Sequence, residues 1–159
     1  MSFNTNSLLV LAVALGLCFG AAALGARVTT PEIPTWYASL AKPSWTPPRA
    51  AFPIVWPILY LLMAVAAWLL WKAEPSPTRT AALIGFAAQL FLNTIWSPVF
   101  FGRHDITGGL VIISLLAATL TFTVFMAFEV DWLPGALLVP YLLWISFAAA
   151  LNFRIWTLN

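Results

Sequence analysis

Charged side chains are scarce in this sequence, and their scarcity excludes an ordinary water-soluble domain. Only 8% of the 159 residues are Asp, Glu, Lys or Arg, whereas 62% are hydrophobic. A typical soluble domain is ~25% charged and ~45–50% apolar, because polar side chains must cover its surface. A chain of this composition is expected to expose its surface to lipid.

Cysteine and histidine are each present once, which excludes two common kinds of site. Cys18 can form no disulfide within the chain, and together with His104 it supplies too few ligands for a metal site. His104 lies in a Gly-Arg-His-Asp segment between apolar stretches, where we expect a solvated loop. The net charge of +2 is too small to predict nucleic-acid binding.

The charge-free stretches of the chain define its predicted fold. Each is roughly 20 residues or longer, enough for a helix to cross the ~30 Å hydrocarbon layer. The first lacks a preceding basic residue, so we expect a retained helix and not a signal peptide. The sequence therefore predicts one all-α domain over 1–159, an integral membrane bundle of five transmembrane helices at about 7–26, 51–72, 79–102, 106–128 and 132–156.

Basic residues are unequally shared between the two ends of this predicted bundle. The end that holds the C-terminus carries five of them: Arg27, Lys42, Arg49, Arg103 and Arg154. The opposite end carries Lys72 and Arg79. The positive-inside rule then places the C-terminus inside and the N-terminus outside, in a membrane that we expect to be bacterial.

The first connection, 27–50, is long and has an unusual composition. It holds five of the chain's 12 prolines together with Trp36, Tyr37 and Trp45. A flexible linker would be rich in glycine and serine, whereas proline fixes the backbone. We expect an ordered loop that caps a ligand cavity, with a short helix after Pro34.

Tryptophan and one polar stripe mark the candidate site. Among nine Trp, Trp56 is four residues from Tyr60, and Trp144 is three from Tyr141. On the span 79–102, polar residues recur every fourth position: Gln89, Asn93 and Ser97. Amides in hydrocarbon must be paired, so this stripe either bonds neighbouring helices or orients a ligand in an aromatic pocket.

Conventional catalytic signals are absent from the predicted spans. The charge-free windows 7–26, 51–71, 80–102, 106–128 and 132–153 contain no Asp, Glu, Lys, Arg or His, which argues against a proton-driven transporter. No phosphate loop or nucleophile motif is present. Two small-residue pairs, Gly16 with Gly20 and Ala81 with Gly85, fit either packing within the monomer or a homodimer interface.

Four segments together resemble the translocator protein family, also known as the tryptophan-rich sensory protein or peripheral-type benzodiazepine receptor family. They are WYASLAKPSWTPP (36–48), VWPILYLLMAVAAWLLW (55–71), QLFLNTIWSPVFFG (89–102) and PYLLWISFAAALNFRIW (140–156). The resemblance implies a homodimer of five-helix bundles, with a cavity roofed by the first loop. It implies porphyrin ligands such as protoporphyrin IX or a haem-like tetrapyrrole, and no obligatory cofactor.

The resemblance also implies which residues act. The positions that match the family's ligand pocket are Tyr37, Trp56, Tyr60, Asn93, Trp144 and Ala148. Trp56 and Trp144 match the tryptophans to which light-dependent porphyrin breakdown is attributed. Apart from the resemblance, Lys42 or Arg49 could pair with the acid groups of a porphyrin, because both lie in the first connection. The family's proposed sterol motif is incomplete, because Phe153 replaces its tyrosine.

Three functions follow as expectations. The first is a membrane receptor or sensor that binds porphyrins and related flat apolar ligands in an aromatic cavity. The alternatives are a light-dependent porphyrin-degrading enzyme and a passive transporter of porphyrin or sterol. In each case the expected partners are the lipid bilayer, the ligand and a second copy of the chain.

Overall fold

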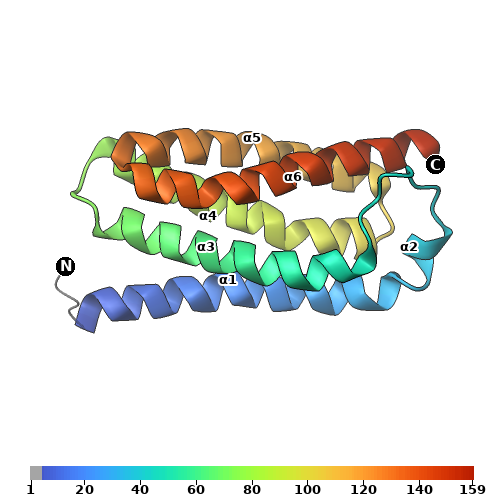
Figure 1. Ribbon diagram of the computed structural model, residues 1–159, viewed down its shortest axis with the longest axis horizontal. Coiled ribbons are helices and arrows are strands. Elements are labelled where there is room, and N and C mark those ends of the chain that lie inside the picture. Colours follow the sequence, from blue (N-terminus) through green and yellow to red (C-terminus); the bar gives the residue numbers. More distant parts are fainter. Residues whose placement is uncertain (1–4) are drawn as a thin grey trace.

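The computed structural model describes residues 5–159, which fold as an antiparallel bundle of five long helices (Figure 1). All five are long and apolar enough to cross a membrane, and no strand occurs within the described residues. The predicted fold class is therefore confirmed. The helices are α1 (Thr5–Glu32), α3 (Phe52–Lys72), α4 (Pro77–Ser97), α5 (Ile106–Val130) and α6 (Trp132–Leu158).

The first helix runs further than the sequence predicted. Its end was expected near residue 26, whereas α1 continues to Glu32 and contains Pro31 in its last turn. A charge-free window marks only the part of a helix that suits hydrocarbon, and backbone hydrogen bonding continues beyond it. Proline is tolerated here because the helix ends one residue later. The predicted first connection of 27–50 is consequently too long.

Short, capped turns set the antiparallel order of the later helices. Ser76 accepts a hydrogen bond from the Arg79 amide at the start of α4, and Asp131 accepts one from the Leu133 amide at the start of α6. The Arg79 guanidinium in turn donates to the Leu70 carbonyl and so caps the end of α3. Side-chain caps satisfy backbone groups that a helix end leaves unpaired.

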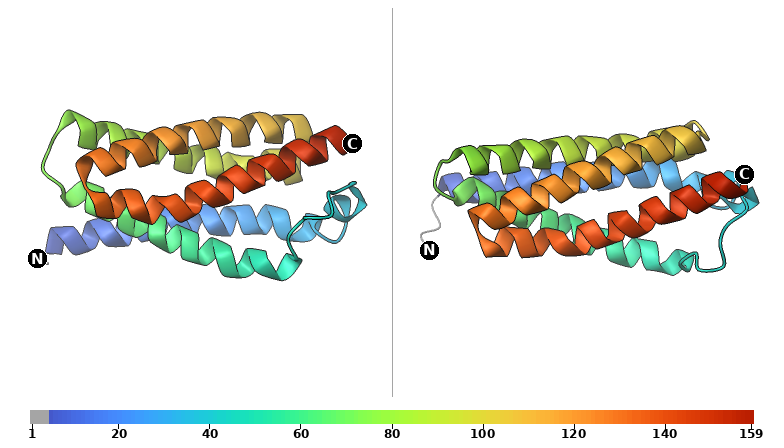
Figure 2. Two further views of the ribbon diagram at one scale, coloured as in Figure 1. Left: turned by 45° about the horizontal axis from the view of Figure 1, so that its top comes forward. Right: turned by 90° about the horizontal axis from the view of Figure 1, so that it is seen from above.

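Each helix has defined neighbours in the bundle. The most extensive pairs are α4 with α5, α5 with α6, α1 with α3, and α3 with α6, as the views in Figure 2 show, and α1 also contacts α4. A Cβ atom added to Gly85 would lie 2.5 Å from Thr123 Oγ1, so this glycine allows α4 and α5 to approach closely. Cβ atoms added to Gly16 and Gly20 would meet nothing within 4 Å among the described residues. Of the two small-residue pairs, the one at Gly85 therefore packs within the monomer.

The α4–α5 turn is preceded by a change of helix type. Pro98 begins a π-helix, η2 (Pro98–Gly102), that continues α4. Proline cannot donate the hydrogen bond of a regular α-helix, which favours a local change in winding at this position. Phe100 and Phe101 become buried there.

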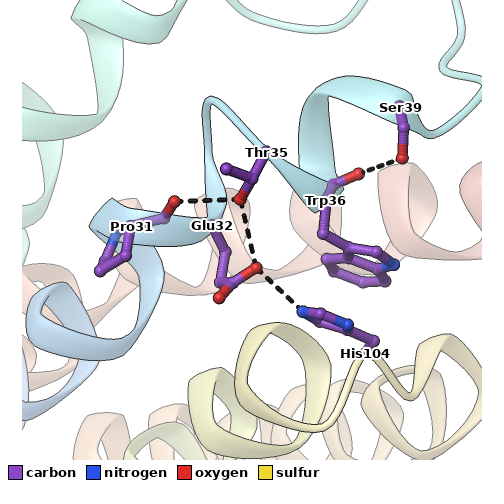
Figure 3. A network of polar contacts seen from close by, with 6 residues as sticks. All are labelled: Pro31, Glu32, Thr35, Trp36, Ser39 and His104. Carbon is purple, nitrogen blue, oxygen red and sulfur yellow. Dashed lines mark hydrogen bonds and ion pairs between the residues drawn. The ribbon is translucent and has the colours of Figure 1, made fainter.

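The first connection lies at the end of the bundle where α6 ends, and it contains the short helices α2 (Trp36–Ser39) and η1 (Arg49–Ala51) (Figure 1). Trp36 stacks on His104 with ring centroids 4.4 Å apart, and His104 Nε2 lies 2.9 Å from Glu32 Oε2 (Figure 3). His104 is exposed as expected, yet it has two partners. The Asn159 side chain adds a second attachment, because it donates to and accepts from the Ala41 backbone.

Candidate functional site

One cavity of about 620 Å³ lies within the bundle near the first connection. Its walls come from α1, α3, α4, η2, α5 and α6, and three residues of the first connection, Ile33, Tyr37 and Arg49, also line it. Almost all of the lining is apolar or aromatic. Cavities of ~300–1,000 Å³ with such walls and a few polar groups are typical small-molecule sites.

The six residues implied by the family resemblance all line this cavity. They belong to four different parts of the chain, and the structure brings them together: Tyr37, Trp56, Tyr60, Asn93, Trp144 and Ala148. Tyr37 comes from α2, Trp56 and Tyr60 come from α3, Asn93 comes from α4, and the last two come from α6. Convergence from separate elements makes this cavity the candidate functional site.

Aromatic rings form one wall of the cavity. Trp56 and Tyr60, one turn apart on α3, stack with centroids 5.5 Å apart. Trp144 on α6 meets Trp56 edge to face at 6.3 Å and 86°. Phe52 contacts the other side of Trp144 at 5.8 Å. A flat aromatic ligand would find indole and phenol faces on this wall.

Asn93 is the centre of a buried hydrogen-bond network. It accepts a bond of 2.6 Å from the Tyr60 hydroxyl and donates one of 2.6 Å to the Tyr141 hydroxyl. Asn93 therefore joins α3, α4 and α6, which is the first of the two roles that the sequence left open for the polar stripe. Because it also lines the cavity, it still presents a polar surface to a ligand.

The other members of the polar stripe behave differently from Asn93. Ser97 lines the cavity and accepts a 3.3 Å hydrogen bond from Thr29. Gln89 is fully buried, lies outside the cavity lining, and has no hydrogen-bond partner for either amide atom within residues 5–159. Only two of the three stripe residues thus reach the site.

The tryptophans of the cavity differ in their hydrogen bonding. The Trp96 indole N–H donates to the Gly109 carbonyl at 3.1 Å and lies 3.3 Å from Asn152 Oδ1. The Trp144 indole N–H is buried and has no partner in the described part of the chain. A buried N–H without a partner is unfavourable. Trp96 is thus anchored by its indole N–H, whereas Trp144 is held by its ring contacts.

Arg49 is the one charged residue among those that line the cavity in the described structure. Lys42, the other predicted candidate for an acidic ligand group, is absent from the lining. Its ammonium group donates to the Tyr37 and Leu40 carbonyls at 2.6 and 2.7 Å. No group of three or more His, Cys, Asp or Glu side chains that could hold a metal occurs within residues 5–159.

Residues 12–157 match the model of the TspO/MBR family, which covers α1 to α6. The chain belongs to this family. It is 41% identical over 154 residues to "Protein CrtK" of Rhodobacter capsulatus, a match that covers 96% of this chain and 94% of the relative. It is 41% identical to the "Tryptophan-rich sensory protein" of Cereibacter sphaeroides, covering 91% and 88% of the two chains. The human "Translocator protein" is 37% identical, with 94% and 86% covered.

These matches confirm the family that the four sequence segments indicated. They also place the chain among proteins that are named sensory or translocator proteins, some of which are bacterial.

The contribution of α1 to the cavity lining was not predicted from the sequence. Six of its residues line the cavity: Phe19, Ala22, Gly25, Ala26, Thr29 and Thr30. Their spacing of three and four residues places most of them on one helix face. The spacing was present in the sequence. However, every face of α1 carries small or apolar residues, so the cavity-facing residues could not be distinguished from the lipid-facing ones.

Proposed function

We propose that this TspO/MBR protein is a membrane receptor or sensor that binds a flat, largely apolar ligand of the porphyrin class, such as protoporphyrin IX or a haem-like tetrapyrrole. The observation that supports this most strongly is the convergence of the six expected pocket residues on one aromatic cavity. Stacking on aromatic side chains contributes ~0.5–1.5 kcal/mol per pair beyond the area buried. A flat conjugated ring suits the wall that Trp56, Tyr60 and Trp144 form.

We further propose that the first connection acts as the cap of this cavity. Tyr37 and Arg49 extend the lining beyond the long helices. The His104 contacts with Glu32 and Trp36 tie the start of the connection to the α4–α5 turn (Figure 3). Asn159 ties the middle of the connection to the end of α6. An attached cap would restrict how a ligand enters and leaves.

The test is a tryptophan-fluorescence titration of the detergent-solubilised protein with protoporphyrin IX. Trp56, Trp96 and Trp144 all line the cavity, so a bound porphyrin should quench their emission saturably at about one ligand per chain. Quenching that rises linearly with porphyrin and never saturates would mean partition into detergent, and the proposal would then be wrong.

Light-dependent porphyrin breakdown is a second candidate, which one observation favours. Trp56 and Trp144 lie edge to face in the same cavity, so a porphyrin bound there would have an indole beside it. An electron-rich indole next to a light-excited ring is positioned to donate an electron or to react with activated oxygen. This chemistry needs no acid–base pair, in keeping with the long stretches of the sequence that carry no charged residue.

The position of Phe153 argues against specific recognition of a sterol by this side chain. This side chain is 50% exposed, stacks on Trp156 at 6.1 Å and is absent from the cavity lining. An apolar, outward-facing side chain on a membrane helix is expected to contact lipid without selecting one kind.

A further inference from the structure

The charge at the cavity is positive and unpaired. Arg49 is exposed and lines the cavity, and its guanidinium has no hydrogen bond or ion pair within residues 5–159. The acidic residues at the same end of the bundle have other partners. Glu32 contacts His104, and Asp105 caps α5 through the Gly108 amide. Lys42 directs its ammonium group to backbone carbonyls. Arg49 is thus the cation that remains available to a molecule in the cavity.

The hydroxyl of Tyr37 is a second available donor beside Arg49. It belongs to the cavity lining and makes no hydrogen bond in the described part of the chain. The ring is held in place by Phe101, with centroids 5.5 Å apart, and by Phe100 at 6.4 Å. A donor on a ring that is fixed in this way is already oriented before any ligand arrives.

The electrostatics of the neighbouring groups agree with an excess of positive charge. Burial raises the pKa of the Tyr37 hydroxyl, and the Arg49 guanidinium partly opposes that rise. Burial lowers the pKa of the Lys42 ammonium, and Arg49 lowers it further. In both cases Arg49 is the only charged group that acts, and it favours negative charge nearby.

We propose that Arg49 and Tyr37 form a carboxylate-recognition site at the mouth of the cavity, so that the preferred ligand is a flat apolar ring with an acid group on one edge. A guanidinium presents paired donors that match the geometry of a carboxylate, and a phenol hydroxyl can add a third bond. The ring would lie against the aromatic wall, while its acid edge stays at the exposed end. This inference rests on the proposed porphyrin function and narrows it to acidic ligands.

The test compares protoporphyrin IX, which carries two carboxylates, with its neutral dimethyl ester. Both are titrated against wild-type protein, Arg49→Gln, Arg49→Lys, Tyr37→Phe and Lys42→Gln. We expect wild type to bind the acid on the order of tenfold more tightly than the ester, the effect of one charge-assisted hydrogen bond. Arg49→Gln should weaken binding of the acid more than binding of the ester and so bring the ratio of the two affinities close to one. Arg49→Lys and Lys42→Gln should retain most of it, and Tyr37→Phe should lower it by a smaller factor.

The outcomes separate this inference from the function on which it rests. Equal affinity of wild type for acid and ester, or an unchanged ratio in Arg49→Gln, would overturn the carboxylate site while leaving porphyrin binding in place. Failure of wild type to bind either compound saturably would overturn the proposed function itself. If Arg49→Gln does not fold, the affinities of Arg49→Lys for acid and ester are measured with added salt instead. Screening by salt should weaken binding of the charged acid and leave binding of the neutral ester unchanged.

Discussion

The indole rings of Trp56 and Trp144 lie 6.3 Å apart, although their helices enter the bundle from opposite ends. Trp56 follows closely after the start of α3, whereas Trp144 is twelve residues along α6 from Trp132. A rise of ~1.5 Å per residue carries Trp144 ~18 Å along its helix to the level of Trp56. The relationship follows from helix geometry, and it places two oxidisable rings at one cavity.

Replacement of either tryptophan by phenylalanine should slow the light-dependent loss of bound protoporphyrin IX. Phenylalanine preserves most of the packing but is a much poorer electron donor than indole. The measurement is the decay of porphyrin absorbance under constant illumination, with Trp45→Phe, outside the cavity lining, as the matched control. Wild-type decay rates in both Trp56→Phe and Trp144→Phe would assign the photochemistry to the ligand alone.

Asn93→Leu should destabilise the bundle as well as weaken ligand binding. The substitution deprives the buried Tyr60 and Tyr141 hydroxyls of a partner, at about 1–3 kcal/mol of unfolding free energy. Thermal unfolding in detergent should therefore show a lower midpoint for this variant, and a smaller drop for Tyr141→Phe. The double variant should lose less than the sum of the two, because both changes break the same bond. Additive losses would show that Asn93 and Tyr141 do not interact.

Gln89→Met should raise the stability of the protein. Both amide atoms of Gln89 are buried without a hydrogen-bond partner among the described residues, and an unpaired buried polar group costs about 1–3 kcal/mol. Methionine has a similar length and carries no amide. The same unfolding assay should show a higher midpoint. A lower one would mean that Gln89 is satisfied by a bound water or by another chain.

The spans of this fold could be predicted from sequence, because long charge-free windows allow few structures in lipid. The end of α1 could not, since Arg27 marks the end of the apolar window and backbone bonding continues to Glu32. Only part of the candidate site could likewise be predicted from the sequence. Its α3, α4 and α6 residues came from the resemblance, whereas the α1 face depends on how that helix is rotated against α3 and α4.

The two small-residue pairs show why a motif alone does not assign an interface. Gly85 packs on Thr123 within the monomer, whereas Gly16 and Gly20 face open space. We therefore expect any homodimer to use α1, with Gly16→Leu and Gly20→Leu shifting the protein towards monomer on size-exclusion chromatography with light scattering. Gly85→Ala should instead lower stability without changing oligomeric state. If the protein remains a dimer in Gly16→Leu and in Gly20→Leu, then α1 does not form the dimer interface.

The central claim, that a porphyrin occupies the cavity, is tested most directly by filling the cavity with protein. Ala148 lines it, whereas Ala150 on the same helix is exposed and absent from the lining, so the two form a matched pair. Saturable binding of protoporphyrin IX should be lost or reduced at least roughly tenfold in Ala148→Phe, given the overpacking that added volume causes. Ala150→Phe should bind as wild type does. Equal affinity of the two variants would contradict the account, because the porphyrin would then be bound elsewhere.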